Sequence, residues 1–181
     1  MCFRAQPNWI VSLVLCLAVC GARAQDPQPT EYQIKAAFLF NFAKFVEWPP
    51  KAFAEAPAPI VIGILGDNPF RDDLARTIRG KAIDDHPLVI KEYRSPAEAT
   101  NCHILFISAS EKKRLLEILE ALKGAKVLTV SETDRFTENG GMINFFLDGT
   151  KIRFQINKDA VTSAGLQISS KLMSLASRPG G

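Results

Sequence analysis

The chain is poor in the residues that catalytic and metal sites most often need. Histidine occurs only twice in 181 residues, at positions 86 and 103, and neither has another His or Cys at metal-ligand spacing. We find no serine with a triad partner and no paired carboxylates suited to acid–base chemistry. We therefore expect a protein that is not an enzyme and that has no cofactor and no metal.

The chain also lacks a large excess of positive or of negative residues. The chain carries 22 basic and 19 acidic residues, and two of the basic ones lie in its first 24 residues, which contain no acid. The remainder is close to neutral and has no basic patch for nucleic acid. A hydrophobic content of 47% is ordinary for a globular domain and excludes a disordered or polytopic membrane protein.

The apolar run at the N-terminus is short. It extends from Trp9 to Cys20, and at ~1.5 Å per helical residue it is too short for a hydrocarbon core of ~30 Å. Arg4 precedes the run and Ala22-Arg23-Ala24 follows it, which is typical of a cleavable signal peptide over residues 1–24. We expect an exported, periplasmic protein that does not span the membrane. A permanent anchor helix and a lipoprotein attached at Cys20 remain alternatives.

Cleavage at that point leaves a single cysteine. The other three leave with the signal peptide, and only Cys102 stays, so an internal disulfide is excluded. Cys102 opens an apolar run, which favours a buried core residue over a reactive thiol. Its state and role stay open.

The rest of the chain predicts one α/β domain over residues 31–181, after a flexible leader at 25–30. Thr30 suits the N-cap of a helix from 31 to about 47, and further helices are expected near 70–79, over 110–124 and toward the C-terminus. Apolar runs at 60–65, 88–93, 104–107 and 126–130 are typical of strands. This alternation predicts a mainly parallel sheet with helices on both faces, a Rossmann-like three-layer arrangement.

An antiparallel hairpin is expected at the edge of that sheet. The segments 142–147 and 150–157 flank Asp148-Gly149, a strong two-residue turn signal. With that turn, Phe145 lies opposite Ile152 on an apolar face, and Phe146 lies opposite Lys151 on a polar face.

Two aromatic residues fall where polar residues are expected. Phe40 lies in the polar arc of the first helix, with Gln33, Lys44 and Glu47, and Phe146 lies on the polar face of the hairpin. Burial of a Phe contributes roughly 1.5–3 kcal/mol, so an exposed one invites a partner surface. The alternative is that another part of the same chain covers each residue.

The order of several segments resembles that of the YfiR-like (HmsC-like) family of exported bacterial proteins. The resemblance begins with the aromatic-rich segment 32–49 and continues through most of the mature chain. The segments that carry it are 32–49, 62–66, 104–108, 128–131, 140–145 and 164–172.

The resemblance implies a periplasmic α/β domain that binds the periplasmic sensor part of an inner-membrane diguanylate cyclase. Binding would hold the cyclase inactive, lower cyclic-di-GMP and restrain biofilm formation. The family offers no catalytic residues to carry over. Some members have cysteine pairs whose oxidation state matters, whereas this chain has Cys102 alone. The family also occurs beside other membrane sensors, so the partner is a membrane cyclase or another membrane sensor.

We expect the partner contacts on the outer face of the hairpin and the helix after it. The residues are Phe146, Arg153 and Gln155, with Val161, while Phe40 suits self-association as a homodimer. One alternative function is a periplasmic small-ligand sensor that uses a crevice near Gly66–Asn68 and Ser108, beyond the ends of the parallel strands. Another is an enzyme of Rossmann-like fold.

Overall fold

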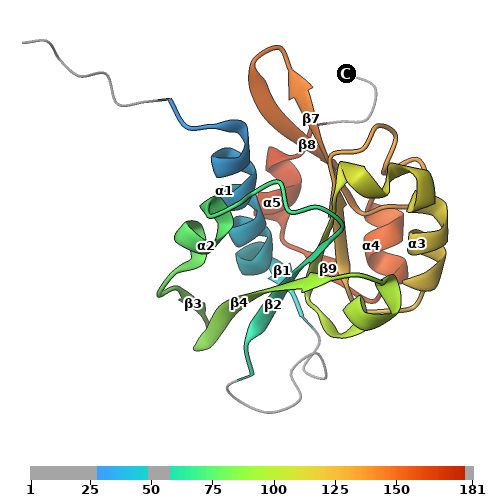
Figure 1. Ribbon diagram of the computed structural model, residues 1–181, viewed down its shortest axis with the longest axis horizontal. Coiled ribbons are helices and arrows are strands. Elements are labelled where there is room, and N and C mark those ends of the chain that lie inside the picture. The colour runs from blue at the N-terminus through green and yellow to red at the C-terminus, as the bar shows by residue number, and fades with distance from the viewer. Residues whose placement is uncertain (1–27, 49–57, 178–181) are drawn as a thin grey trace, which may run out of the picture.

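The computed structural model describes residues 28–48 and 58–177. The expected signal peptide, Cys20 and residues 25–27 lie outside the described residues. The described chain forms an α/β fold with a seven-stranded sheet and a separate two-stranded sheet (Figure 1). Its elements are α1 (Glu31–Phe45), β1 (Val46–Glu47), β2 (Ile60–Leu65), α2 (Asp73–Ile78), β3 (Ala82–Ile83), β4 (His86–Tyr93), the 3-10 helix η2 (Pro96–Asn101), β5 (Ile104–Ile107), the 3-10 helix η3 (Ala109–Arg114), α3 (Leu115–Ala121), β6 (Leu128–Ser131), β7 (Ile143–Asp148), β8 (Lys151–Ile156), α4 (Lys158–Ser163), β9 (Gln167–Ile168) and α5 (Ser170–Leu175).

The large sheet is mixed. Its strand order is β3-β4-β2-β5-β6-β7-β8. The pairings β2–β4, β2–β5, β5–β6 and β6–β7 are parallel, whereas β3–β4 and β7–β8 are antiparallel. The α/β class and the antiparallel edge hairpin agree with the sequence, but the second antiparallel edge, β3, was not expected. The Rossmann-like three-layer arrangement stays a prediction.

The central strands carry apolar side chains on both faces. In β2, Ile60, Ile62 and Ile64 belong to one buried cluster, and Val61 and Leu65 belong to another. Helices α1, α2 and α5 contribute to the first cluster, and α3 and η2 contribute to the second (Figure 1). A strand covered on both faces reads as a continuous apolar run, which is why β2 was recognisable from the sequence.

Helix α1 is fixed at its start and along its buried face. The Thr30 hydroxyl accepts from the Gln33 backbone N–H while the Gln33 side chain accepts from the Thr30 N–H, a capping box. On its buried face the Phe42 ring lies 5.7 Å from Phe145 and 5.1 Å from Phe154, between ring centroids. These aromatic contacts attach α1 to the edge hairpin.

The register of the hairpin differs from the expected one. Asp148 pairs with Lys151, so the loop is Gly149-Thr150, and Phe146 lies opposite Arg153 rather than Lys151. Gly149 has φ +59°, the positive value that the first position of this kind of turn requires and that glycine adopts freely. The pairing therefore shifts by two residues. Because side chains alternate with a period of two, each residue keeps its expected face.

Candidate functional site

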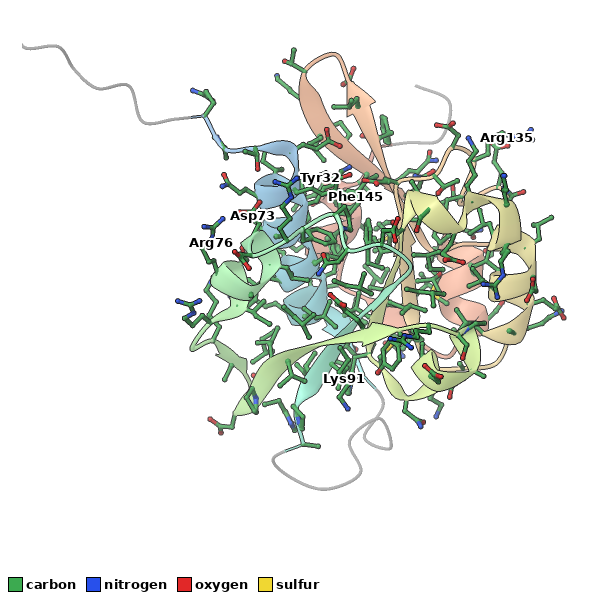
Figure 2. All side chains as sticks on the ribbon, in the orientation of Figure 1. Tyr32, Asp73, Arg76, Lys91, Arg135 and Phe145 are labelled. Atoms are coloured by element: carbon green, nitrogen blue, oxygen red, sulfur yellow. The ribbon has the colours of Figure 1, made fainter. Side chains whose placement is uncertain are left out.

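A hollow of about 570 Å³ lies between α1 and the hairpin, in the size range of ligand pockets. Its lining comes from three parts of the fold: the start of α1, the segment after β6, and the hairpin. In Figure 2, the labelled Tyr32 on α1 and Phe145 on β7 mark two of these parts. The lining residues are Glu31, Tyr32, Lys35, Glu132, Asp134, Arg135, Asn144, Phe145, Phe146, Leu147, Ile152 and Gln155.

The hollow borders on a buried lysine. Lys35 is 3% exposed, and its ammonium forms ion pairs with both Glu31 and Glu132. Glu31 precedes Lys35 by one helical turn, whereas Glu132 comes from the end of β6. An ammonium in this position is tolerated because two carboxylates compensate its desolvation. The two ion pairs also tie the first turns of α1 to the segment after β6.

Tyr32 completes this group. Its hydroxyl donates to the Glu132 carboxylate at 3.1 Å, and the Lys35 ammonium lies 4.8 Å from its ring centroid. Burial, followed by the negative charge of Glu132, raises the pKa of Tyr32 to about 12. The hydroxyl therefore stays protonated at physiological pH and acts as a hydrogen-bond donor.

Side-chain hydrogen bonds hold the segment after β6 against the hairpin. The Asn144 amide accepts from the Phe136 backbone N–H at 3.2 Å and donates to the Ser131 carbonyl at 3.3 Å. The Gln155 amide donates to the Thr137 hydroxyl at 2.9 Å. These buried and half-buried groups have their partners in place, so this wall of the hollow is preformed.

The hairpin extends past the strand beside it. Strand β7 pairs with β6 only at Ile143 and Asn144, and its later residues pair with β8 alone. Figure 1 shows the β7–β8 hairpin in orange, projecting beyond the rest of the sheet. Phe146 is 37% exposed and Leu147 is 59% exposed on this projection. Two large apolar side chains thus meet solvent beside the hollow.

Two of the residues expected at a partner contact, Phe146 and Gln155, line this hollow together. Arg153 lies opposite Phe146 in the register, is exposed, and forms an ion pair with Asp148 at 3.5 Å. The register therefore places these three residues on one face of the hairpin. Their role as partner contacts stays a prediction.

The other two expected contacts are less exposed than Phe146, and for Val161 this corrects the expectation. Val161 of α4 is 3% exposed and belongs to the core cluster under α1, so it offers no surface to a partner. Phe40 is half-buried, because it packs against the core and the Lys81 ammonium lies 4.4 Å from its ring centroid. Residues of the same chain thus cover part of Phe40. Its role in self-association stays a prediction.

At the crevice expected for a small ligand, Ser110 lies close to the Gly66–Asn68 turn. The Ser110 hydroxyl accepts from the Asp67 backbone N–H at 3.0 Å, and a Cβ on Gly66 would lie only 2.5 Å from it. A single helix was expected over residues 110–124. Instead, Ser108 caps the 3-10 helix η3, and α3 follows only at Leu115. The hollow described above lies at a different place.

Sequence reasoning did not identify the Lys35 group. Glu31 and Lys35 have the i, i+4 spacing of a helical ion pair, which was the local signal available. That spacing gives no sign of burial, and Glu132 is 97 residues away in the sequence. Only the folded chain brings the two carboxylates to one ammonium.

Cys102 does not line the hollow, and the possible metal ligands are not clustered in the part of the chain that the structure describes. Cys102 is buried, and burial raises its pKa to about 12, which favours the core interpretation over a reactive thiol. In residues 28–48 and 58–177, no group of three or more His, Cys, Asp or Glu side chains is placed to hold a metal ion. None of the helices in these ranges combines the length and apolar character needed to cross a bilayer.

The chain is similar to known proteins both in its fold and in its sequence. A crystal structure of a conserved domain protein from Vibrio cholerae is similar, with a TM-score of 0.56 and 12% identity over 82% of this chain, and the chain spans 60% of that protein's length. A likeness at this identity concerns the fold alone. The sequence description of the YfiR/HmsC-like family matches residues 32–177, which include the seven-stranded sheet with its hairpin, and all of α1 and of the lining of the hollow except Glu31. The chain therefore belongs to the YfiR/HmsC-like family.

Proposed function

We propose that this protein is an exported periplasmic regulator that binds the sensor part of an inner-membrane diguanylate cyclase and holds the cyclase inactive. Repression would lower cyclic-di-GMP and restrain biofilm formation. Family membership supports a regulator of this kind. The regulator can shift the cyclase only as far as it binds the inactive form more tightly than the active one.

The observation that carries the proposal is the exposed pair Phe146 and Leu147 at the projecting end of the hairpin. Aromatic side chains next to a recess are typical anchors in protein interfaces. Gln155 lines the same hollow and Arg153 lies across from Phe146, so polar groups flank the Phe146 ring on its face of the hairpin. An apolar centre with a polar rim is the usual composition of such an interface.

The ionisable groups around the hollow favour binding over catalysis. Lys35 is engaged by two carboxylates, and the Tyr32 hydroxyl donates to one of them. The ammonium and the hydroxyl are thus both engaged by neighbouring side chains of the same chain. We therefore assign the cluster to structure and recognition.

The test is truncation of Phe146 with a matched control. Loss of an aromatic anchor weakens binding by ~2 kcal/mol or more, a factor of about thirty in affinity. Phe146→Ala should therefore raise cellular cyclic-di-GMP and biofilm formation, as deletion of the gene would. The control is Leu116→Ala on α3, because Leu116 is 66% exposed and lies in an element that does not line the hollow.

Cyclic-di-GMP is measured in cells that carry each variant at the native locus, and immunoblots report the amount in the periplasm. Normal repression by Phe146→Ala at normal abundance would refute the proposed contact. Derepression by Leu116→Ala to the same extent would show that the effect is not specific to the hairpin.

A second candidate function, a periplasmic small-ligand sensor, is favoured by the size of the hollow. A ligand that binds only the folded protein raises its Tm in proportion to the logarithm of its concentration. A thermal-shift screen with nucleotides and amino acids therefore tests this candidate. A positive compound whose effect disappears in Phe146→Ala would place it in the hollow.

A further inference from the structure

The charges beneath the hollow do not balance. One ammonium, on Lys35, faces the two carboxylates of Glu31 and Glu132, and Tyr32 adds a donor without adding charge. The Glu132 side chain is only 15% exposed. The group of Lys35, Glu31 and Glu132 therefore has a net charge of −1 and lies in a partly desolvated place. Its attraction for a cation is stronger there than at an open surface.

The other charged groups that line the hollow, Asp134 and Arg135, form ion pairs with residues that do not line it. Asp134 pairs with Lys112 at 3.4 Å, and Arg135 pairs with Glu138 at 2.6 Å. These side chains are largely exposed, so solvent and salt screen them. They also cancel each other, since each pair has one charge of each sign.

The basic residues of the hairpin do not neutralise the excess charge. Arg153 pairs with Asp148 at 3.5 Å, and neither it nor Lys151 lines the hollow. In the register, Lys151 lies opposite Asp148, at the turn. The group of Lys35, Glu31 and Glu132 thus keeps its net negative charge.

The hairpin side of the hollow is apolar. Phe145, Phe146 and Leu147 line it from β7, and the last two extend the apolar surface out to solvent. Lys and Arg side chains suit such a place, because their aliphatic stems pack on apolar groups while their charged ends reach a carboxylate. The apolar surface outside the hollow favours a side chain carried by a protein over a free small cation, which would leave Phe146 and Leu147 uncovered.

We infer that the hollow receives a lysine or arginine side chain of the regulated membrane protein, with Glu132 and Glu31 as its counter-charges and Phe146 against its stem. This inference rests on the proposed function, because it assigns a chemistry to the partner that the hairpin binds. Arginine fits best, since its planar guanidinium can donate to two carboxylate oxygens at once.

The first test uses a small probe on the purified protein. N-acetyl-arginine amide carries the charged end and its stem, and N-acetyl-citrulline amide has nearly the same shape without the charge. Amide chemical shifts in NMR titrations measure both affinities. We expect the arginine probe to bind at least about tenfold more tightly at low salt, with shifts at the start of α1 and along β7. Equal affinities for the two probes would overturn the inference.

The second test removes the excess charge. Glu132→Gln keeps the shape and can still accept from Tyr32, so the preference for arginine over citrulline should fall to nearly none. The control is Glu117→Gln on α3, an exposed carboxylate that pairs with Arg114 and does not line the hollow. It should leave the preference unchanged.

A folding defect in Glu132→Gln would appear in its thermal unfolding curve. In that case Glu31→Gln serves instead, because Glu31 is the more exposed of the two carboxylates and its loss removes the same charge. A folded Glu31→Gln or Glu132→Gln that still prefers arginine would overturn the inference.

The cellular readout separates this inference from the proposed function. If both hold, Glu132→Gln and Phe146→Ala each raise cyclic-di-GMP. If Phe146→Ala derepresses while folded Glu132→Gln represses normally, the protein is a regulator and the cationic contact is wrong. If neither variant derepresses although deletion of the gene does, both proposed contacts are wrong. If deletion of the gene does not derepress either, the proposed function fails, whatever the probes bind.

Discussion

Adjacent phenylalanines of one strand have opposite roles in this molecule. Phe145 is 1% exposed and its ring packs on Phe38 and Phe42 of α1, whereas Phe146 is 37% exposed and points to the other face. We call the buried part of the hairpin, Phe145 with Phe154, its root, and the exposed part, Phe146 with Leu147, its tip. The root holds the fold together, and the tip is free for a partner.

The difference arises from what covers each face of the hairpin. Helix α1 covers the face that carries Phe145 and Phe154, whereas Phe146 points to the opposite face. Beyond Asn144 the pairing with β6 ends, and the hairpin continues on its own. A large apolar side chain gains stability only where other elements cover it. The same residue type therefore stabilises the fold at position 145 and leaves apolar surface exposed at position 146.

The largest effect on stability should come from the root. Phe145→Ala leaves a cavity among the rings of α1 and β8, and we expect it to lower the free energy of unfolding by about 3–5 kcal/mol. Chemical denaturation followed by circular dichroism measures the loss. A change below about 1 kcal/mol would mean that the root is no more important than the tip.

An intermediate loss of stability is expected from a substitution at Gly141, just before β7. A Cβ on Gly141 would lie 2.2 Å from the Phe136 ring, which is fully buried on the other face of the sheet. Gly141→Ala should therefore cost about 1–3 kcal/mol, because the ring must move within a packed core. The matched variant is Gly140→Ala, where nothing lies within 4 Å but φ is +98°. Because Gly141 does not have a positive φ, its loss reports the ring contact, and a loss below about 1 kcal/mol would show that the ring moves aside easily.

The smallest effect on stability is expected at the tip. Phe146→Ala should change the free energy of unfolding by only about 0.5 kcal/mol, since its ring is partly in water already. The same denaturation experiment measures it beside Phe145→Ala. Together with derepression in cells, this result would separate a binding residue from a folding residue. A loss comparable to that of Phe145→Ala would instead make Phe146 part of the core.

Most elements of the fold could be predicted from local sequence. The β-branched run of β2, the Thr30 cap of α1 and the edge hairpin each have a local cause, and each is present in the structure. The turn was misplaced by one residue, because both Asp148 and Gly149 suit a loop and only the backbone conformation decides between them. Strand β3, two residues long, has no distinct pattern of its own.

The candidate site was predicted in part. Phe146 stood out because an aromatic residue alternates with polar ones, and it is exposed as that pattern suggests. Val161 was expected at the surface but is buried, and Phe40 is half-buried, because the exposure of each depends on which elements pack against α4 and α1. For the same reason, the buried position of Lys35 could not be predicted. Its charge is compensated by Glu132, a residue distant in sequence.

The sequence by itself determined the alternation of helices and strands, the faces of the hairpin and the family, because these follow from short-range periodicity and the order of segments along the chain. The tertiary structure alone decided which side chains are exposed and which charges meet. Those properties depend on distances between segments far apart in sequence, such as Lys35 and Glu132, and such distances exist only once the layers have packed.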